Sequence, residues 1–211
     1  MRVPGSVIES QPGRPRRAAP AGYTLIEVVL GAALVATILT LVVPQLWRWS
    51  ARLRLELVCS EVVTGLRQAQ FHAFTHSQFV GLKYWTQSQP VRWGVYRDGD
   101  GDGVLTADIR RGHDPPVRLH GAQGRLGASV WFGFPLGLRP RDPGDPGRYL
   151  DRLHDPIRFG RSDLVVFNHL GTSSPGTLYL TNGWDLAAVR VTNRSGRVRI
   201  LHYDRHREVW R

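Results

Sequence analysis

Three groups of residues in this 211-residue chain combine types and spacings that could do chemistry. A single carboxylate, Glu27, interrupts the apolar run over residues 23–43. Alternating aspartates at 98, 100 and 102 resemble the start of a cation-binding loop, and arginines crowd residues 190–199. A carboxylate in lipid is costly unless its charge is paired. Alternating aspartates can bind a hard cation such as calcium, and clustered arginines can bind phosphate groups.

The apolar run around Glu27 is long enough to cross a bilayer. About 20 residues with a rise of 1.5 Å each span roughly 30 Å, the thickness of the hydrocarbon core. A cleaved secretory signal has a shorter apolar stretch followed by small residues, whereas Pro44-Gln-Leu-Trp follows here. We therefore expect a retained transmembrane helix, in which Glu27 either reaches the interface or has a function.

The residues before Glu27 resemble the processing site of type IV prepilins and pseudopilins. The matching stretch is Gly22-Tyr23-Thr24-Leu25-Ile26-Glu27. The resemblance implies that a prepilin peptidase cleaves after Gly22, that Tyr23 becomes the methylated first residue, and that Glu27 serves filament assembly. Tyr23 stands where phenylalanine is commoner, and the 1–22 leader is longer than in most pilins. Pro44 matches the proline that bends many pilin helices.

Beyond Pro44 the pattern becomes amphipathic. Apolar residues recur at spacings of three and four on one helical face, at positions 55, 58, 62, 66, 69 and 73. We predict one helix from about residue 24 to about 76, bent near Pro44, whose 44–76 half packs on a head domain. Cys59 in this half is either a buried, inert thiol or a reactive one. His72 and His76 share a face but lack a metal-binding frame.

Residues 77–211 are expected to form a β-rich head. Alternating patterns separated by turn signals predict strands at 78–85, 91–97, 117–120, 128–134, 164–168, 177–181, 187–192 and 197–203. Together with the long helix they predict an α+β fold with antiparallel sheets. Residues 133–163 hold five prolines and six arginines and predict a long basic loop, either functional or mobile.

Motifs in the head resemble the GspH/FimT family of minor pseudopilins and minor pilins. They are the segments 93–98, 167–180 and 188–199. The resemblance covers the chain from Tyr23 onward except the 133–163 loop, and implies a pilin-like fold of a long N-terminal helix with two antiparallel sheets. It also implies a bacterial inner-membrane protein with its head in the periplasm, assembled with other pseudopilins or pilins. The flanking arginines favour a cytoplasmic N-terminus only marginally.

The aspartate-rich segment has two interpretations. Asp98, Asp100 and Asp102 followed by Gly103 match the start of a calcium loop. The closing position falls on Ile109, which has no ligand atom, while Asp108 lies one residue earlier. The segment is thus either a solvated turn or a calcium site of these four aspartates, and calcium is the only cofactor that the sequence suggests.

The basic hairpin also has two interpretations. Period-two alternation places Arg190, Arg197 and Arg199 on the outer face, with Arg194 at the turn. The Gly196-Arg-Val-Arg199 string resembles the G-R-x-R of FimT-type pilins that bind DNA during uptake. The face is either a solvated basic surface or a DNA contact.

Composition narrows the function classes. The net charge is +11, and Lys83 is the only lysine among 28 basic residues. Removing the leader, with four arginines and one glutamate, would leave +8. One cysteine excludes an intramolecular disulfide, and no nucleophile elbow or other enzyme motif is found.

We therefore predict a minor subunit of a type II secretion pseudopilus or type IV pilus. The alternatives are a pilus-tip DNA receptor and an unprocessed single-pass membrane protein. The sequence does not separate secretion from pilus machinery.

Overall fold

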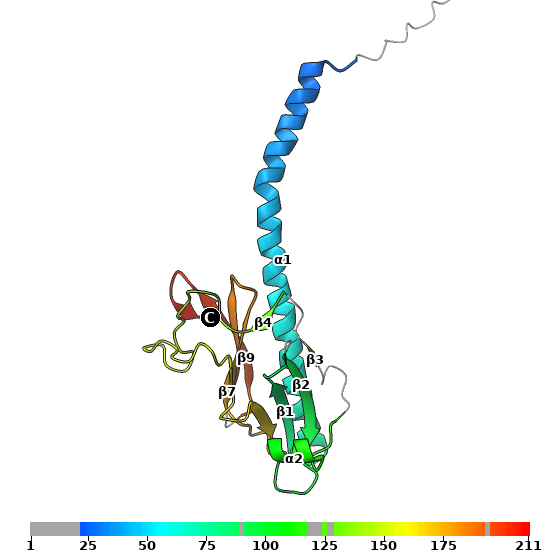
Figure 1. Ribbon diagram of the computed structural model, residues 1–211, viewed down its shortest axis with the longest axis vertical. Coiled ribbons are helices and arrows are strands. Elements are labelled where there is room, and N and C mark those ends of the chain that lie inside the picture. The colour runs from blue at the N-terminus through cyan, green and yellow to red at the C-terminus, as the bar shows by residue number, and fades with distance from the viewer. Residues whose placement is uncertain (1–21, 89–90, 118–123, 126–128, 193–194) are drawn as a thin grey trace, which may run out of the picture. The chain divides into compact units, whose positions relative to one another are not determined.

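The computed structural model describes residues 22–88, 91–117, 124–125, 129–192 and 195–211 (Figure 1). The chain divides into two compact units, Met1–Pro44 and Gln45–Arg211. The predicted leader, residues 1–22, lies outside the described residues except for Gly22.

One long helix, α1, runs from Leu25 to Thr75, one residue inside each predicted limit. Pro44 lies within it and marks the boundary between the two units. In the first unit, every described side chain from residue 22 to 44 is exposed.

In the second unit, α1 buries one face. Its buried side chains recur every three or four residues: Leu55, Cys59, Val62, Val63, Leu66, Ala69 and Ala73. They join strands of both sheets in a single core. The predicted apolar face is therefore confirmed, because only side chains at this period can all point to one side of a helix.

Two antiparallel sheets complete the second unit. The first has the order β3-β2-β1-β6 and comprises β1 Val80–Trp85, β2 Arg92–Arg97, β3 Gly124–Arg125 and β6 Leu164–Phe167. The second has the order β10-β9-β8-β7-β4, with β5 also paired to β7. Its strands are β4 Trp131–Phe132, β5 Ile157–Arg158, β7 Gly176–Thr181, β8 Leu186–Val191, β9 Val198–Asp204 and β10 Val209–Trp210. The predicted α+β class with a long N-terminal helix on antiparallel sheets is confirmed.

Some predicted elements differ from the described structure. The strand at 128–134 shrinks to Trp131–Phe132 among its described residues, and Val117 lies outside any strand, with 118–120 not described. A short helix, α2 Thr106–Arg111, and the terminal strand β10 were not predicted. These elements are too short for a periodic pattern of apolar residues to reveal them. Strand pairing and helix capping determine where they form.

The 133–163 segment is not the wholly irregular loop that the sequence predicted. It contains β5, which pairs with β7 through Ile157↔Leu178. It also folds over the outer face of the second sheet and forms a second apolar cluster. The buried members are Leu150, Tyr179, Leu186, Ala188 and Tyr203, packed against Phe134, Leu138, Leu153, Leu201 and Trp210. Prolines interrupt its backbone pairing, but its apolar residues still find a shared core.

Candidate functional sites

Glu27 lies in the first turn of α1. Its backbone N–H donates to the Thr24 hydroxyl, with Nα and Oγ1 3.3 Å apart. Thr24 and Glu27 have the spacing of a capping box, and a carboxylate in the first turn also faces the positive end of the helix dipole. Sequence reasoning missed this local role, although the Thr-x-x-Glu spacing announces it. Gly22 and Tyr23, at the expected cleavage position, are exposed and precede the helix.

Among the described residues, α1 alone combines the length and apolar character that a membrane crossing requires. Its most apolar 18-residue window has a mean hydropathy of 2.5, and none of that window is buried. A core helix of a soluble protein would bury those side chains. Exposed apolar side chains are expected of a helix that faces lipid or other subunits.

The aspartate loop is organised by backbone hydrogen bonds. The Asp98 carboxylate accepts from the N–H groups of Asp100, Gly101 and Gly103 at 3.2, 2.7 and 3.1 Å. At the other end of the loop, the buried Asp114 carboxylate accepts from Gly99 and Leu105 N–H at 3.1 and 2.9 Å. These bonds explain the turn without any ion.

The four predicted calcium ligands nevertheless converge in two overlapping groups. Oxygen atoms of Asp98, Asp100 and Asp102 lie within 4.8 Å of one another, as do ligand atoms of Asp100, Asp108 and His113. Asp108 is buried and faces Arg111 and His113 at 3.5 and 3.6 Å.

Crowding in this loop acts on Asp102. Desolvation raises its pKa, and the hydrogen bond to Asp100 and the charge of Asp100 raise it further. This repulsion is what a cation bound between the carboxylates would relieve.

The basic hairpin has the predicted alternation. Arg190 pairs with Arg199 across β8 and β9, and Arg197 and Arg199 are exposed. Arg194 lies outside the described residues. Arg190 differs from the prediction, because it is only partly exposed and its Nη1 donates to the Pro143 carbonyl of the 133–163 segment. The outer face is therefore partly covered by that segment.

A third arginine faces the exposed end of the hairpin. Arg67 of α1 lines a hollow of about 500 Å³ together with Arg197 and Arg199. Gln70, Ser195, Gly196 and Val198 complete its walls. Sequence reasoning missed Arg67, since nothing in its spacing links a helix residue to a hairpin more than a hundred residues away.

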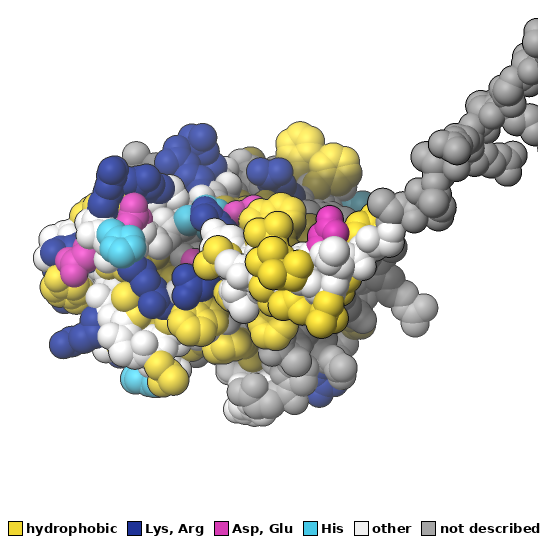
Figure 2. Space-filling view, turned by 90° about the horizontal axis from the view of Figure 1, so that it is seen from above, with side chains coloured by type: hydrophobic (Ala, Val, Ile, Leu, Met, Phe, Trp, Pro, Cys, Tyr) yellow, Lys and Arg dark blue, Asp and Glu magenta, His cyan; other side chains and the backbone are white. Residues whose placement is uncertain are grey.

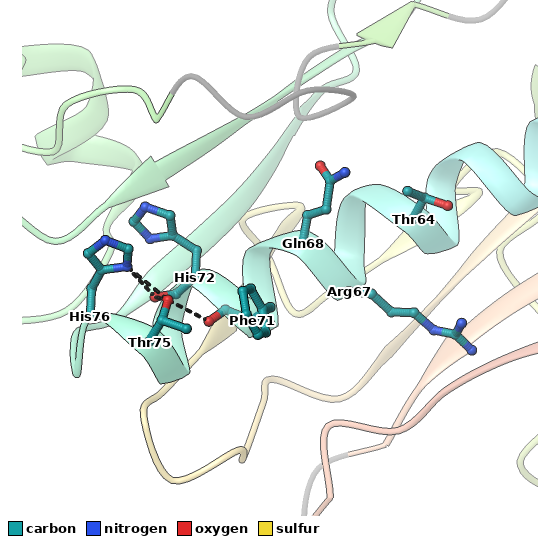
Figure 3. A pocket seen from close by; sticks show the side chains of 7 residues that line it. All are labelled: Thr64, Arg67, Gln68, Phe71, His72, Thr75 and His76. Carbon is teal, nitrogen blue, oxygen red and sulfur yellow. Dashed lines mark hydrogen bonds between the residues drawn. The ribbon is translucent and has the colours of Figure 1, made fainter.

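A second hollow, of about 600 Å³, runs along α1 itself (Figure 3). At its end the rings of His72 and His76 stack with centroids 4.0 Å apart, which confirms that they share a helix face. Burial lowers the pKa of His72, and the nearby charges of His76 and Arg97 lower it further. The Gln68 Oε1 atom is buried and has no hydrogen-bond partner among the described residues.

Two further ionisable groups are buried inside the second unit. Cys59 is fully buried, and burial, with a smaller contribution from Glu56, raises its pKa to about 12. Lys83 is also buried, and its ammonium donates to the Ser162 carbonyl beside the Trp85 ring. Burial lowers the pKa of Lys83.

The full burial of Cys59 supports the interpretation of this thiol as inert.

Comparisons with known proteins gave one solved structure to set beside this fold. No protein-family model and no curated protein matches the chain. The chain is similar to the minor pseudopilin EpsH from the type 2 secretion system of Vibrio cholerae, with 12% identity and a TM-score of 0.44. The match covers 71% of this chain and 97% of that chain.

The chain has the α+β architecture that the resemblance predicted, a long N-terminal helix with an exposed apolar first half and a second half packed on antiparallel sheets.

Proposed function

We propose that this chain is a minor subunit of a type II secretion pseudopilus or type IV pilus. It would be held in the inner membrane with its head in the periplasm, cleaved after Gly22 by a prepilin peptidase, methylated on Tyr23 and assembled with other pilin-type subunits. The observation that carries the proposal is the lone carboxylate of Glu27. It follows the Gly22-Tyr23 sequence and begins an exposed apolar helix whose continuation packs on the head.

The chemistry couples processing to assembly. An unpaired carboxylate within the membrane is unfavourable by a few kcal/mol. Cleavage after Gly22 exposes a new amino group at Tyr23, and the amino group of a neighbouring subunit can pair with Glu27. Joining a filament therefore supplies the partner that the membrane lacks.

Glu27→Ala tests this role. The variant should insert and be cleaved normally but fail to enter filaments, as measured by immunoblotting of sheared filament fractions and mass spectrometry of the N-terminus. Thr24→Ala is the matched control, because it removes the helix cap at a cost of about 1 kcal/mol while keeping the carboxylate. It should still assemble. Normal incorporation of Glu27→Ala, or equal loss in both variants, would contradict the assembly role.

A second candidate function is DNA contact by the head. The observation that favours it is the hollow shared by Arg67, Arg197 and Arg199, two exposed hairpin arginines and one from α1. Three arginines that line one depression suit contacts with successive phosphates, and such contacts make the binding affinity fall steeply with salt. If the head binds DNA, the subunit would act as a DNA receptor at the tip of an uptake pilus.

Arg197→Ala/Arg199→Ala in the full chain tests this function. A gel-shift titration at several salt concentrations should show weaker DNA binding and a salt slope smaller by about 1 for each lost phosphate contact. Arg67→Ala should act in the same direction. The control Arg139→Ala/Arg148→Ala alters exposed arginines of the 133–163 segment and should leave binding unchanged. Absence of binding by the parent at low salt would reject this candidate.

A further inference from the structure

One end of the head presents an exposed tryptophan on a rigid turn. Trp184 is 69% exposed at the tip between β7 and β8. The Asn182 side-chain oxygen accepts from the Trp184 and Asp185 N–H groups at 2.9 and 2.7 Å. The Thr181 hydroxyl donates to the Asp185 carbonyl at 2.8 Å. A turn fixed this firmly holds the indole outside the fold, so contact with a partner would cost little ordering entropy.

A second turn at the same end is basic. Arg205 and Arg207, between β9 and β10, are exposed and form no ion pair within the described part of the chain. The acids beside them are already paired. Asp204 faces Arg211 at 3.3 Å, and Glu208 contacts Arg141 at 3.0 Å and the Tyr149 hydroxyl at 2.9 Å. Figure 2, seen from above, shows Lys and Arg side chains spread over this face of the molecule, with Asp, Glu and His side chains between them.

Strand direction places this end toward the N-terminal side of the α1 segment in the same unit. The opposite turn, between β8 and β9, lies beside Gln70, because a Cβ on Gly196 would meet the Gln70 side chain at 2.5 Å. The seven residues of β9 then lead about 20 Å away from that turn. Figure 1 shows the β7–β8 turn in orange and the β9–β10 turn in red at the upper end of the sheet.

The start of this unit continues directly from the apolar segment. Trp47 and Trp49 of α1 are 74% and 62% exposed, and Arg48 between them is exposed. Tryptophans gather at membrane–water interfaces, and arginines near the surface are attracted to anionic lipids. The covalent link to the apolar segment also keeps any bilayer that holds it within reach of the head, at a high effective concentration.

We propose that the end of the head formed by Trp184, Arg205 and Arg207 docks on anionic phospholipid headgroups of the membrane that holds α1. The proposal rests on the proposed membrane anchorage of the chain. Docking orders the head on the bilayer before assembly, and extraction into a filament breaks it. The occupant is a lipid surface because the covalent link keeps lipid nearby and the exposed ring suits the interface. Arg205 and Arg207 also outnumber Asp185, the exposed carboxylate beside Trp184, among the described residues of the two turns.

The test uses the full chain reconstituted in vesicles, with a nitroxide label at His206→Cys, an exposed position between the two arginines that leaves Trp184, Arg205 and Arg207 in place. Accessibility to a water-soluble nickel complex should be largely lost in phosphatidylglycerol vesicles and retained in phosphatidylcholine vesicles. High salt, or Arg205→Gln/Arg207→Gln, should restore it. Leu170→Cys is the matched control, since Leu170 is 75% exposed and precedes β7, at the far end of that strand. Its label should stay accessible in both lipids.

The outcomes separate the occupants. Full accessibility of the His206→Cys label in both lipids overturns the proposal, as does equal shielding in both. Shielding that disappears when the protein is diluted in excess lipid identifies a second copy of the chain as the occupant and also overturns it. Resistance to alkaline extraction is measured on every sample. Extraction of the chain from the vesicles would contradict the proposed membrane anchorage. Retention of the chain with an accessible label would contradict only the docking of the head.

Discussion

At the scale of single residues, burial decides which groups can react. Cys59 lies in the core between α1 and the sheets, and its raised pKa of about 12 keeps the thiol protonated at any physiological pH. Because the thiolate is the nucleophile, neither disulfide formation with another subunit nor alkylation is expected while the domain is folded. The second interpretation left open by the sequence is therefore disfavoured by packing.

We predict that Cys59 does not react with a thiol reagent in the native chain at about pH 8, near the ordinary cysteine pKa. It should react fully after denaturation, with Cys59→Ala as the blank. Raising the pH toward 12 should speed the native reaction, since the thiolate fraction grows as pH rises toward the raised pKa. A stoichiometric native reaction, or a dimer that reductant dissolves, would contradict this.

Glu27 shows that one residue can have both a local and an intermolecular role. Its position in the first turn of α1 stabilises the start of the helix. Its charge lies within an apolar segment and is unfavourable there unless a group of opposite charge pairs with it. The paired variants at Glu27 and Thr24 separate these roles, because only one of them removes the carboxylate.

At the scale of elements, the loop between β2 and α2 is the clearest case of preorganisation. Backbone hydrogen bonds to Asp98 and Asp114 fix its path, and this path brings two groups of ligand atoms together. Asp100 belongs to both groups.

We predict millimolar calcium binding by this loop, measured by calorimetric titration of the full chain. Asp100→Asn should abolish it, and Asp151→Asn, an exposed aspartate outside both groups, should not. Affinity should rise with pH through the raised pKa of Asp102, because calcium binds the ionised carboxylates. Absence of heat at millimolar calcium would leave the loop as a solvated turn.

The 133–163 segment is an element in its own right because it has an apolar interior. Leu150 is 1% exposed in the second cluster, while Leu136, in the same segment, is 101% exposed. Its backbone is also tied down, with Leu150 N–H donating to the Pro140 carbonyl at 2.8 Å.

We predict that Leu150→Ala destabilises this region by about 2–5 kcal/mol, the usual cost of a buried leucine truncation. Limited proteolysis should cleave the variant faster within 133–163, and urea unfolding should shift to lower concentration. Leu136→Ala should match the parent in both measurements. Unchanged proteolysis of Leu150→Ala would mean that the second cluster does not hold the segment.

At the scale of the whole molecule, charge and apolar surface are divided between the two units. The Met1–Pro44 unit holds the predicted leader, whose removal would lower the net charge from +11 to +8, and the exposed apolar stretch. The Gln45–Arg211 unit holds the remaining basic surface, which is almost entirely arginine because the single lysine is buried. Guanidinium groups form bidentate hydrogen bonds with phosphate, so this surface suits the phosphate groups of DNA or of lipid.

The sequence by itself determined the helix, its apolar and amphipathic halves, and most strands, because these follow from the period of the apolar residues along the chain. It also placed Glu27 at the helix start and the arginines of residues 190–199 on alternate positions. Only the tertiary structure decided that the 133–163 segment forms a second core, that Arg190 is held by Pro143, and that Arg67 joins Arg197 and Arg199. These contacts join residues far apart in the chain, and local periodicity carries no information about which distant segments meet.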